Sequence, residues 1–227
     1  MPASGLNVGV IAAVEAITAR TRRVRIEAAA LRSASLEAGT DLLFEFSGLR
    51  RHYSAWRHDR AAGAVELAPV VHTAGVGGEH WLNAMVGQQV RFTVSRPLAI
   101  RAFPDAIGHH FFGDETSVAT TEALVRSLAP SLFVSACFEV AGERDAWPLA
   151  YLERPQSTRF VARDGVRAGQ SSAFVDRLTA VASTDHAVYA TGETRLVQIV
   201  MDHFRRRNWA SSRLFVLPYW RLRPSYR

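Results

Sequence analysis

The sequence changes its pattern near residue 100, and this change constrains the fold more than any other feature. From residue 7 to residue 98, short stretches of alternating apolar and polar residues are separated by closely spaced turn residues, and Arg96-Pro97 ends the pattern. Such a pattern indicates antiparallel strands in a small barrel or sandwich. We expect strands at 8–17, 22–27, 41–46, 52–58, 64–72 and 89–95, and a helix at 78–86.

After residue 105, apolar runs alternate with amphipathic stretches. Apolar strands that are buried on both faces and separated by helices form a parallel sheet with right-handed crossovers. The sequence therefore predicts a β plus α/β chain, with an antiparallel β-barrel domain over 1–98 and a doubly wound α/β domain over 105–227. In the second domain we expect strands at 109–113, 132–140, 158–162, 187–191 and 213–217, and helices at 117–128, 171–183 and 194–207.

The charge composition favours anionic partners. All 27 basic residues are arginine, and the formal net charge is +6. Such a balance favours anionic small molecules or acidic proteins. The densest run, Arg205-Arg206-Arg207, ends a predicted helix, where cations are normal, and no nucleic-acid-binding signature is present. We therefore expect no nucleic-acid partner.

Cysteine content and hydropathy further narrow the class of protein to which this chain can belong. Cys137 is the only cysteine, so an intrachain disulfide and a cysteine-ligated cluster are excluded. No apolar stretch reaches the length of a membrane span, and the first thirty residues lack the pattern of a secretory leader. We expect a cytoplasmic protein without a membrane partner.

Arg51-His52-Tyr53-Ser54 is the first candidate site. In an extended strand, Arg51 and Tyr53 point to one face and Ser54 points to the other. A guanidinium beside an aromatic ring suits a flavin nucleotide, because the guanidinium can bind a phosphate and the ring can lie against the flavin. The alternative is an ordinary edge strand with a solvated surface.

Two strand-to-helix turns form the second candidate site. Residues 112–117 and 190–194 each place a Gly-acid pair after a predicted strand, at the same edge of the sheet. Ligands of doubly wound folds bind at this edge, near the helix N-termini. Asp, Glu and Thr in a first helical turn are also normal capping residues. The occurrence of two such turns at one edge favours ligand binding.

Several ordered segments resemble one family, the siderophore-interacting proteins, which are FAD-dependent NAD(P)H ferric-siderophore reductases of the ferredoxin reductase-like superfamily. The tetrapeptide is similar to the family's Arg-x-Tyr-Thr/Ser flavin motif, and His72 lies at the family's spacing from Trp81. The other similar segments are Gly113-Asp114-Glu115-Thr116, Glu139-Val140, Tyr189-Ala190-Thr191-Gly192-Glu193 and Leu217-Pro218-Tyr219-Trp220-Arg221.

The resemblance implies an FAD-binding-type barrel followed by a Rossmann-like NAD(P)H-binding-type domain. Hydride would pass from the nicotinamide to FAD, and electrons would pass on to a ferric siderophore or a similar small acceptor, without a catalytic side chain or a resident metal. The implied FAD residues are Arg51, Tyr53, Ser54, His72, Gly77, Gly78 and Trp81. The implied NAD(P)H residues are Gly113, Asp114, Glu115, Thr116, Gly192 and Glu193. Tyr219 and Trp220 would lie near the flavin or nicotinamide ring.

One departure from the family leaves the cofactor open. Glu79 occupies a position where the family has a phosphate-binding hydroxyl, and a carboxylate there would repel a pyrophosphate unless it faces water. An alternative is therefore a flavin-free scaffold, reused as a cofactor-independent enzyme or as a binding protein for an apolar small molecule in a biosynthetic pathway. Its ligand cleft would be lined by Tyr53, Trp56, Trp81, Tyr219 and Trp220.

Two further questions stay open at the level of sequence. The electron acceptor could instead be an acidic electron-transfer protein, because the chain is basic. The donor could be NADH, if Glu139 binds an unphosphorylated ribose, or NADPH, if Arg144 or Arg154 binds a phosphate. The remaining histidines, including His109, His110 and His186, show no metal-ligand spacing.

Overall fold

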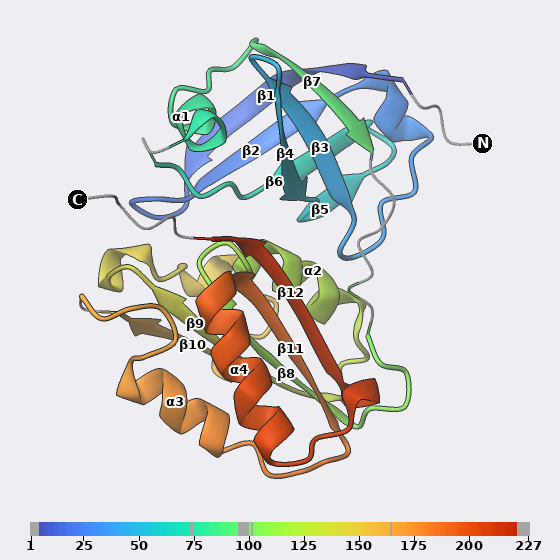
Figure 1. Ribbon diagram of the computed structural model, residues 1–227. Helices are drawn as coiled ribbons and strands as arrows, with labels where there is room; N and C mark the ends of the chain where they lie inside the picture. The colour runs from blue at the N-terminus through green and yellow to red at the C-terminus, as the bar shows by residue number, and fades with distance from the viewer. Residues whose placement is uncertain (1–4, 73–74, 95–99, 101, 164, 222–227) are drawn as a thin grey trace. The chain divides into compact units, whose positions relative to one another are not determined.

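The computed structural model describes residues 5–72, 75–94, 100, 102–163 and 165–221. The chain divides into two compact units, Met1–Arg101 with Ala119–Ser127 and Ala102–Val118 with Leu128–Arg227 (Figure 1). Arg96, Pro97 and the expected domain end at residue 98 lie outside the described residues, as does residue 95 at the end of the expected strand 89–95. The domain limits 1–98 and 105–227 remain a prediction.

The first unit is built on a seven-stranded antiparallel sheet in the order β4-β3-β7-β1-β2-β6-β5. Its core contains side chains that point inward from the strands, including Leu42, Phe44 and Phe92. None of these three side chains has exposed surface. This confirms the antiparallel barrel. The strands are β1 (Asn7–Ala16), β2 (Arg22–Glu27), β3 (Asp41–Phe46), β4 (Leu49–Ser54), β5 (Arg57–Asp59), β6 (Ala64–Leu67) and β7 (Gln89–Val94), with the helices η1 (Ala29–Arg32) and α1 (Val76–Leu82).

Three expected elements of this unit are clearly wrong in their bounds. The expected strand at 64–72 ends at Leu67, as β6. The expected strand at 52–58 is divided into β4 and β5, because the chain turns inward at Ala55 and Trp56, which are both buried. The expected helix at 78–86 begins earlier, at Val76, and ends at Leu82. Glycines are poor helix formers, so a helix that begins just before Gly77 and Gly78 is not predicted from the sequence pattern.

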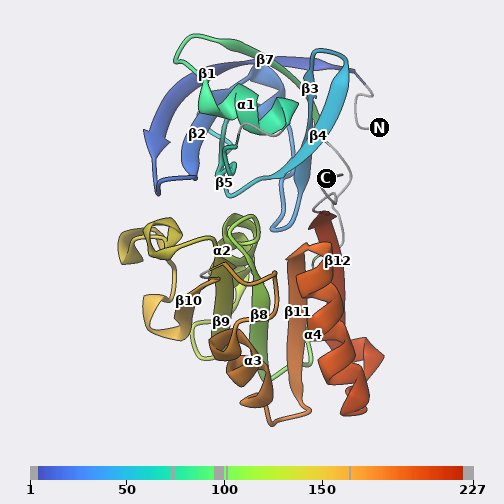
Figure 2. The same cartoon turned by 60° about the vertical axis from the view of Figure 1, so that its left-hand side comes forward.

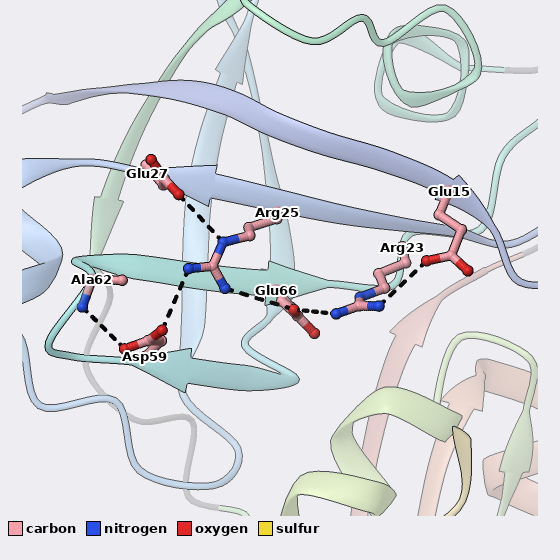
Figure 3. Close-up of polar contacts among 7 residues, drawn as sticks. All are labelled: Glu15, Arg23, Arg25, Glu27, Asp59, Ala62 and Glu66. Carbon is pink, nitrogen blue, oxygen red and sulfur yellow. Dashed lines mark hydrogen bonds and ion pairs between the residues drawn. The ribbon is translucent and has the colours of Figure 1, made fainter. Parts of the chain in front are cut away.

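An ion-pair network covers part of the barrel surface. The carboxylate of Glu66 lies between the guanidinium groups of Arg23, at 2.6 Å, and Arg25, at 3.8 Å (Figure 3). Arg25 also reaches Asp59 at 3.4 Å. These arginines on β2 pair with carboxylates of their own unit, so the network links β2 to β5 and β6.

The second unit is built on a parallel sheet in the order β10-β9-β8-β11-β12. Helices α3 and α4 share one hydrophobic core with side chains of the sheet, including Phe112, Val188 and Ala190 (Figure 2). This confirms the Rossmann-like arrangement. The strands are β8 (Gly108–Asp114), β9 (Phe133–Val140), β10 (Thr158–Ala162), β11 (His186–Glu193) and β12 (Leu214–Trp220). The helices are η2 (Glu143–Asp145), η3 (Leu149–Tyr151), η4 (Pro155–Ser157), α3 (Ser172–Thr179), α4 (Thr194–Arg206) and η5 (Ser211–Arg213). Helix α2 (Val118–Ser127) follows β8 in the chain, but all of it except Val118 belongs to the first unit.

The last strand is longer than expected. The sequence predicts an end at residue 217, but β12 continues through Pro218 and Tyr219 to Trp220. Proline is tolerated here because β12 is an edge strand and pairs with β11 only. Within the described ranges, none of the helices is long and apolar enough to cross a bilayer.

Candidate functional site

In the barrel, Arg51 and Tyr53 converge on the first turn of α1. Gly77 packs so closely that a Cβ added there would overlap the hydroxyl of Tyr53 and lie 3.3 Å from Cγ of Arg51. This agrees with the prediction that both side chains share one face of β4. The strand and the helix therefore bring a guanidinium, a phenol and a glycine backbone together.

His72 closes the other side of the same turn. A Cβ added at Gly78 would lie 2.7 Å from Cδ2 and from the carbonyl oxygen of His72. The two glycines thus allow α1 to approach β4 on one side and His72, in the loop that follows β6, on the other. Glu79, the next residue, is exposed and faces an open hollow of about 510 Å³ that also borders Phe46 and Val76.

The ring of Tyr53 is fixed by aromatic neighbours. It meets Phe44 and Trp81 edge-on, with ring centroids 5.9 and 5.5 Å away. Burial raises the pKa of Tyr53 to about 12, against the opposing effects of the neighbouring Trp81 and of the charge of Arg51. The phenol is therefore neutral at physiological pH. Trp81 itself has no exposed surface and supports Tyr53 from the core.

The hydroxyl of Ser54 has a partner within the barrel. It donates a hydrogen bond of 2.7 Å to Oδ1 of Asp41, a residue at the start of β3. Burial raises the pKa of Asp41, although this hydrogen bond and the nearby His52 lower it. The guanidinium of Arg51, by contrast, is exposed and donates to the carbonyl oxygen of Arg50 at 2.8 Å.

At the carboxyl edge of the parallel sheet, the central group is Asp114 at the end of β8. Its carboxylate has no exposed surface. Oδ1 accepts hydrogen bonds from the backbone N–H and the hydroxyl of Thr116, at 2.8 and 2.5 Å. Oδ2 accepts from the backbone N–H of Glu193 at 2.7 Å and from Nε1–H of Trp220 at 2.9 Å. Asp114 therefore links the ends of β8, β11 and β12.

The glycines beside Asp114 permit this close packing. Gly192 has φ +111°, and a Cβ there would lie 2.7 to 2.8 Å from the carboxyl atoms of Asp114. A Cβ at Gly113 would lie 2.5 Å from the hydroxyl of Ser117 and 2.9 Å from the carbonyl oxygen of Thr191. Burial raises the pKa of Asp114 to about 6, and the neighbouring carboxylate of Glu115 adds to the shift.

The other acids at this edge also bind groups of their own unit. Glu193 is the N-cap of α4 and accepts from the backbone N–H of Arg195 at 2.6 Å. Glu115 forms a bidentate ion pair with Arg163, at 2.9 and 3.1 Å. Glu139 is fully buried and accepts from the backbone N–H of Gly169 at 2.7 Å. Capping and internal pairing thus account for all of these carboxylates.

Aromatic surface remains at the end of β12. The side chain of Trp220 is 37% exposed although its indole N–H is held by Asp114. Its carbonyl oxygen accepts from the hydroxyl of Thr194 at 2.8 Å, which fixes the strand end against α4. Tyr219 is half-buried. The edge therefore presents a positioned indole face above a buried carboxylate.

Sequence reasoning missed several of these contacts. Asp114 and Trp220 are 106 positions apart, and only the strand order brings them together. His186, expected to be isolated, lies 2.9 Å from His110, ring nitrogen to ring nitrogen. Arg154, a candidate for a nucleotide phosphate, donates instead to carbonyl oxygens after α2, including that of Leu132 at 2.6 Å. The described residues contain no group of three or more potential metal ligands.

Solved structures share this fold. A siderophore utilization protein from T. fusca is 20% identical, with a TM-score of 0.80 and coverage of 96% of this chain and 93% of that one. The siderophore-interacting protein SipS from Aeromonas hydrophila is 14% identical, with a TM-score of 0.81 and coverage of 95% and 91%. A cytochrome P450 reductase from Amycolatopsis is 23% identical, with a TM-score of 0.74 and coverage of 95% and 69%.

At these identities the likeness establishes the fold alone, which this chain shares with siderophore-interacting proteins and with a cytochrome P450 reductase. A sequence search of curated proteins finds no significant match. The model of the family described as siderophore-interacting protein matches residues 106–223, more than half of the chain. The chain therefore belongs to the siderophore-interacting protein family.

Proposed function

We propose that this protein is an FAD-dependent NAD(P)H oxidoreductase that delivers electrons to a ferric siderophore or a similar small acceptor. The observation that carries the proposal is the convergence of Arg51, Tyr53 and His72 on the glycine turn of α1. Membership of the siderophore-interacting family and the reductase-like fold support it. When bound, FAD would supply the redox chemistry, taking a hydride from the nicotinamide and passing on electrons singly.

The barrel residues fit FAD in part. Arg51 has an exposed guanidinium that can donate to a phosphate, and the neutral ring of Tyr53 offers an aromatic edge beside it. His72, which is exposed, can donate or accept next to them. Gly77 and Gly78 set the approach of α1. Ser54 would accept a hydrogen bond, because its proton is directed to Asp41, and Trp81 would position Tyr53 without touching the cofactor.

Glu79 is compatible with this arrangement. The sequence leaves open whether its carboxylate would repel a pyrophosphate or face water. Its side chain is exposed and borders the open hollow beside Phe46 and Val76. Water around the carboxylate screens its charge, so repulsion of a phosphate would be weak.

For NAD(P)H binding, we assign the main role to the shape of the turns at the sheet edge and not to their carboxylates. Asp114, Glu115 and Glu193 already bind groups of the protein, so they would orient the turns that carry Gly113, Thr116 and Gly192. The exposed indole of Trp220, with Tyr219 beside it, would provide the surface on which a flavin or nicotinamide ring stacks.

The acceptor would be anionic. The net charge of +6 favours capture of a ferric chelate that carries carboxylates or catecholates. An acidic electron-transfer protein is a second acceptor of the same chemistry. Turnover with such a protein should weaken steeply with salt, whereas turnover with a small ferric chelate should respond less.

The test is the absorbance spectrum of the purified protein during titration with FAD. We expect saturable FAD binding and bleaching of the bound flavin by NADH or NADPH under anaerobic conditions. Arg51→Gln should raise the Kd for FAD roughly tenfold, because a charge-assisted hydrogen bond is lost. Arg50→Gln is the matched control, since Arg50 is also exposed and adjacent on β4. A protein that binds no FAD would end the proposal.

A second function is favoured by the same contacts. The open sides of Gly77 and Gly78 are filled by Tyr53 and His72, and the proton of Ser54 is directed to Asp41. This closed packing suits a flavin-free scaffold that acts as a cofactor-independent enzyme or binds an apolar small molecule. It predicts a colourless protein whose thermal stability does not change when FAD is added.

A further inference from the structure

The second unit has a hollow that the proposed oxidoreductase function does not use. Its volume is about 330 Å³, within the size range of small-molecule sites. Its floor is formed by neighbouring strands: His110 pairs with Ser135 across β8 and β9, Phe112 pairs with Cys137, and Cys137 pairs with Arg159 on β10. In-register residues of a parallel sheet point to the same face, so these side chains form one surface.

The short helix α3 borders this surface. α3 packs beside β9 (Figure 2). It ends at Thr179, and its Arg177 lines the hollow together with the following Ala180 and Val181. On the opposite side, η4 contributes Gln156 and Ser157. The hollow lies on the same face of the sheet as α3 and α4, and its lining does not include the residues of the carboxyl edge.

Two arginines border the hollow. Arg159 lies on β10 and Arg177 on α3, and none of the described residues that line the hollow is a carboxylate. Burial raises the pKa of the Cys137 thiol to about 12, the charge of Arg177 opposes this shift, and the charge of Glu139 on the same strand adds to it. Cys137 is therefore a thiol and not a nucleophile.

The remaining polar groups are donors or neutral. Burial lowers the pKa of His110 to about 4, so the imidazole is neutral at physiological pH. Its Nδ1 bonds the hydroxyl of Ser135 at 2.9 Å, and its Nε2 bonds Nδ1 of His186. The rest of the lining is apolar and includes Phe112, Phe133 and Val181. An apolar floor between two guanidinium groups suits a ligand that has an apolar body and an anionic end.

We propose that this hollow is a binding site for a small organic anion, a carboxylate or sulfonate carried on an aromatic or branched apolar body. The apolar part would lie against the exposed side chain of Phe133, and the anionic group would reach Arg159 and Arg177. The site is separate from the residues to which FAD and NAD(P)H are assigned, so it stands or falls independently of the oxidoreductase proposal.

The experiment is a fluorescence titration of the full chain with 8-anilinonaphthalene-1-sulfonate, an aromatic sulfonate that becomes fluorescent in apolar surroundings. We expect one saturable site per chain. Arg177→Gln and Arg159→Gln should each weaken binding roughly two- to fivefold, and the double variant roughly tenfold, as expected for partly exposed charge pairs. N-phenyl-1-naphthylamine lacks the sulfonate, and its affinity should be the same for all of these proteins.

Two further variants keep the test decisive. Arg205→Gln removes an exposed arginine from the last turn of α4 and should change the Kd less than twofold. Ala180→Phe places a ring at the exposed rim and should reduce binding of both probes without unfolding the protein. Equal sulfonate affinity in the wild-type protein and the Arg159/Arg177 double variant would overturn the proposal. Unchanged binding of both probes by the folded Ala180→Phe variant would do so as well.

Discussion

Strand β4 of the barrel and the carboxyl edge of the parallel sheet both carry motifs that resemble the family, but they use their polar groups differently. On β4 the guanidinium of Arg51 is exposed. At the sheet edge, Asp114 and Glu139 have no exposed surface, and their oxygens accept hydrogen bonds from the protein. A buried carboxylate is tolerated only when its oxygens have such donors. The barrel therefore keeps a charge available to a ligand, whereas the sheet edge uses its charges to hold its own turns.

The two regions illustrate two physical reasons why a residue can be required at its position. The stem of Arg51 packs beside Gly77 while its guanidinium is exposed, so a ligand would be one physical reason for its place beside Tyr53. Asp114 and Gly192 are required for the turn whether or not a ligand binds, because the carboxylate fills the space that a side chain at 192 would need. Substitutions in the two regions should therefore affect stability and binding to different degrees.

The largest effect should follow Gly192→Ala. The new methyl group would overlap a carboxylate held by four hydrogen bonds, and φ +111° is unfavourable for alanine. We expect a loss on the order of 3 kcal/mol or more in the free energy of unfolding, measured by urea denaturation. Gly48→Ala in the β3–β4 turn is the control, with φ +79° and no atom within 4 Å of the added Cβ. It should cost about 1–2 kcal/mol. Equal losses would contradict the tight packing of Asp114 on Gly192.

The next effect concerns pH. Because the folded protein raises the pKa of Asp114 from 3.8 to about 6, it binds this proton more tightly than the unfolded chain does. The contribution of Asp114 to stability is therefore largest below pH 4 and falls as the pH rises to 6, by on the order of 3 kcal/mol. Asp114→Asn removes the titration, so the stability difference between wild type and variant should shrink by that amount between pH 4 and 7.

Asp59 provides a control of opposite sign. The backbone N–H of Ala62 and the charge of Arg25 lower the pKa of Asp59, so its contribution is lost as the pH falls. Asp59→Asn should therefore reduce the stability gained above pH 4. If the curves of wild type and Asp114→Asn run parallel over this range, Asp114 does not carry a raised pKa.

The smallest effects should come from β4. Ser54→Ala removes the hydrogen bond to Asp41 and should lower the free energy of unfolding by about 1 kcal/mol. Arg51→Gln should change it by less than about 0.5 kcal/mol, because the side chain is exposed. Urea denaturation without added FAD measures both. An unchanged stability of Ser54→Ala would mean that the hydroxyl is free to bind a flavin.

Much of the fold follows from local pattern. The expected strands at 22–27, 41–46 and 158–162 coincide with β2, β3 and β10. Their residue pattern, either alternating or continuously apolar, begins and ends with the strand itself. The division between β4 and β5 was missed because Trp56, an apolar residue in a strand-like run, turns into the core. The early start of α1 was missed because packing against Tyr53 and His72, and not helix propensity, stabilises its first turn.

The site was predictable only where one strand carries it. The shared face of Arg51 and Tyr53 follows from the period of a strand. The contacts of Asp114 with Glu193 and Trp220 depend on the order β8-β11-β12, which local sequence does not contain. The two Gly-acid turns were correctly expected at one edge, but their acids cap and pair within the protein, so the assignment of NAD(P)H to them remains a prediction.

The exposed indole of Trp220 has a practical consequence. The chain contains five tryptophans, and the other four, Trp56, Trp81, Trp147 and Trp209, are buried. A small aqueous quencher such as acrylamide should therefore extinguish the emission of Trp220 first. The protein thus contains an intrinsic optical reporter at the end of β12, and any molecule that covers this ring should protect it from collisional quenching.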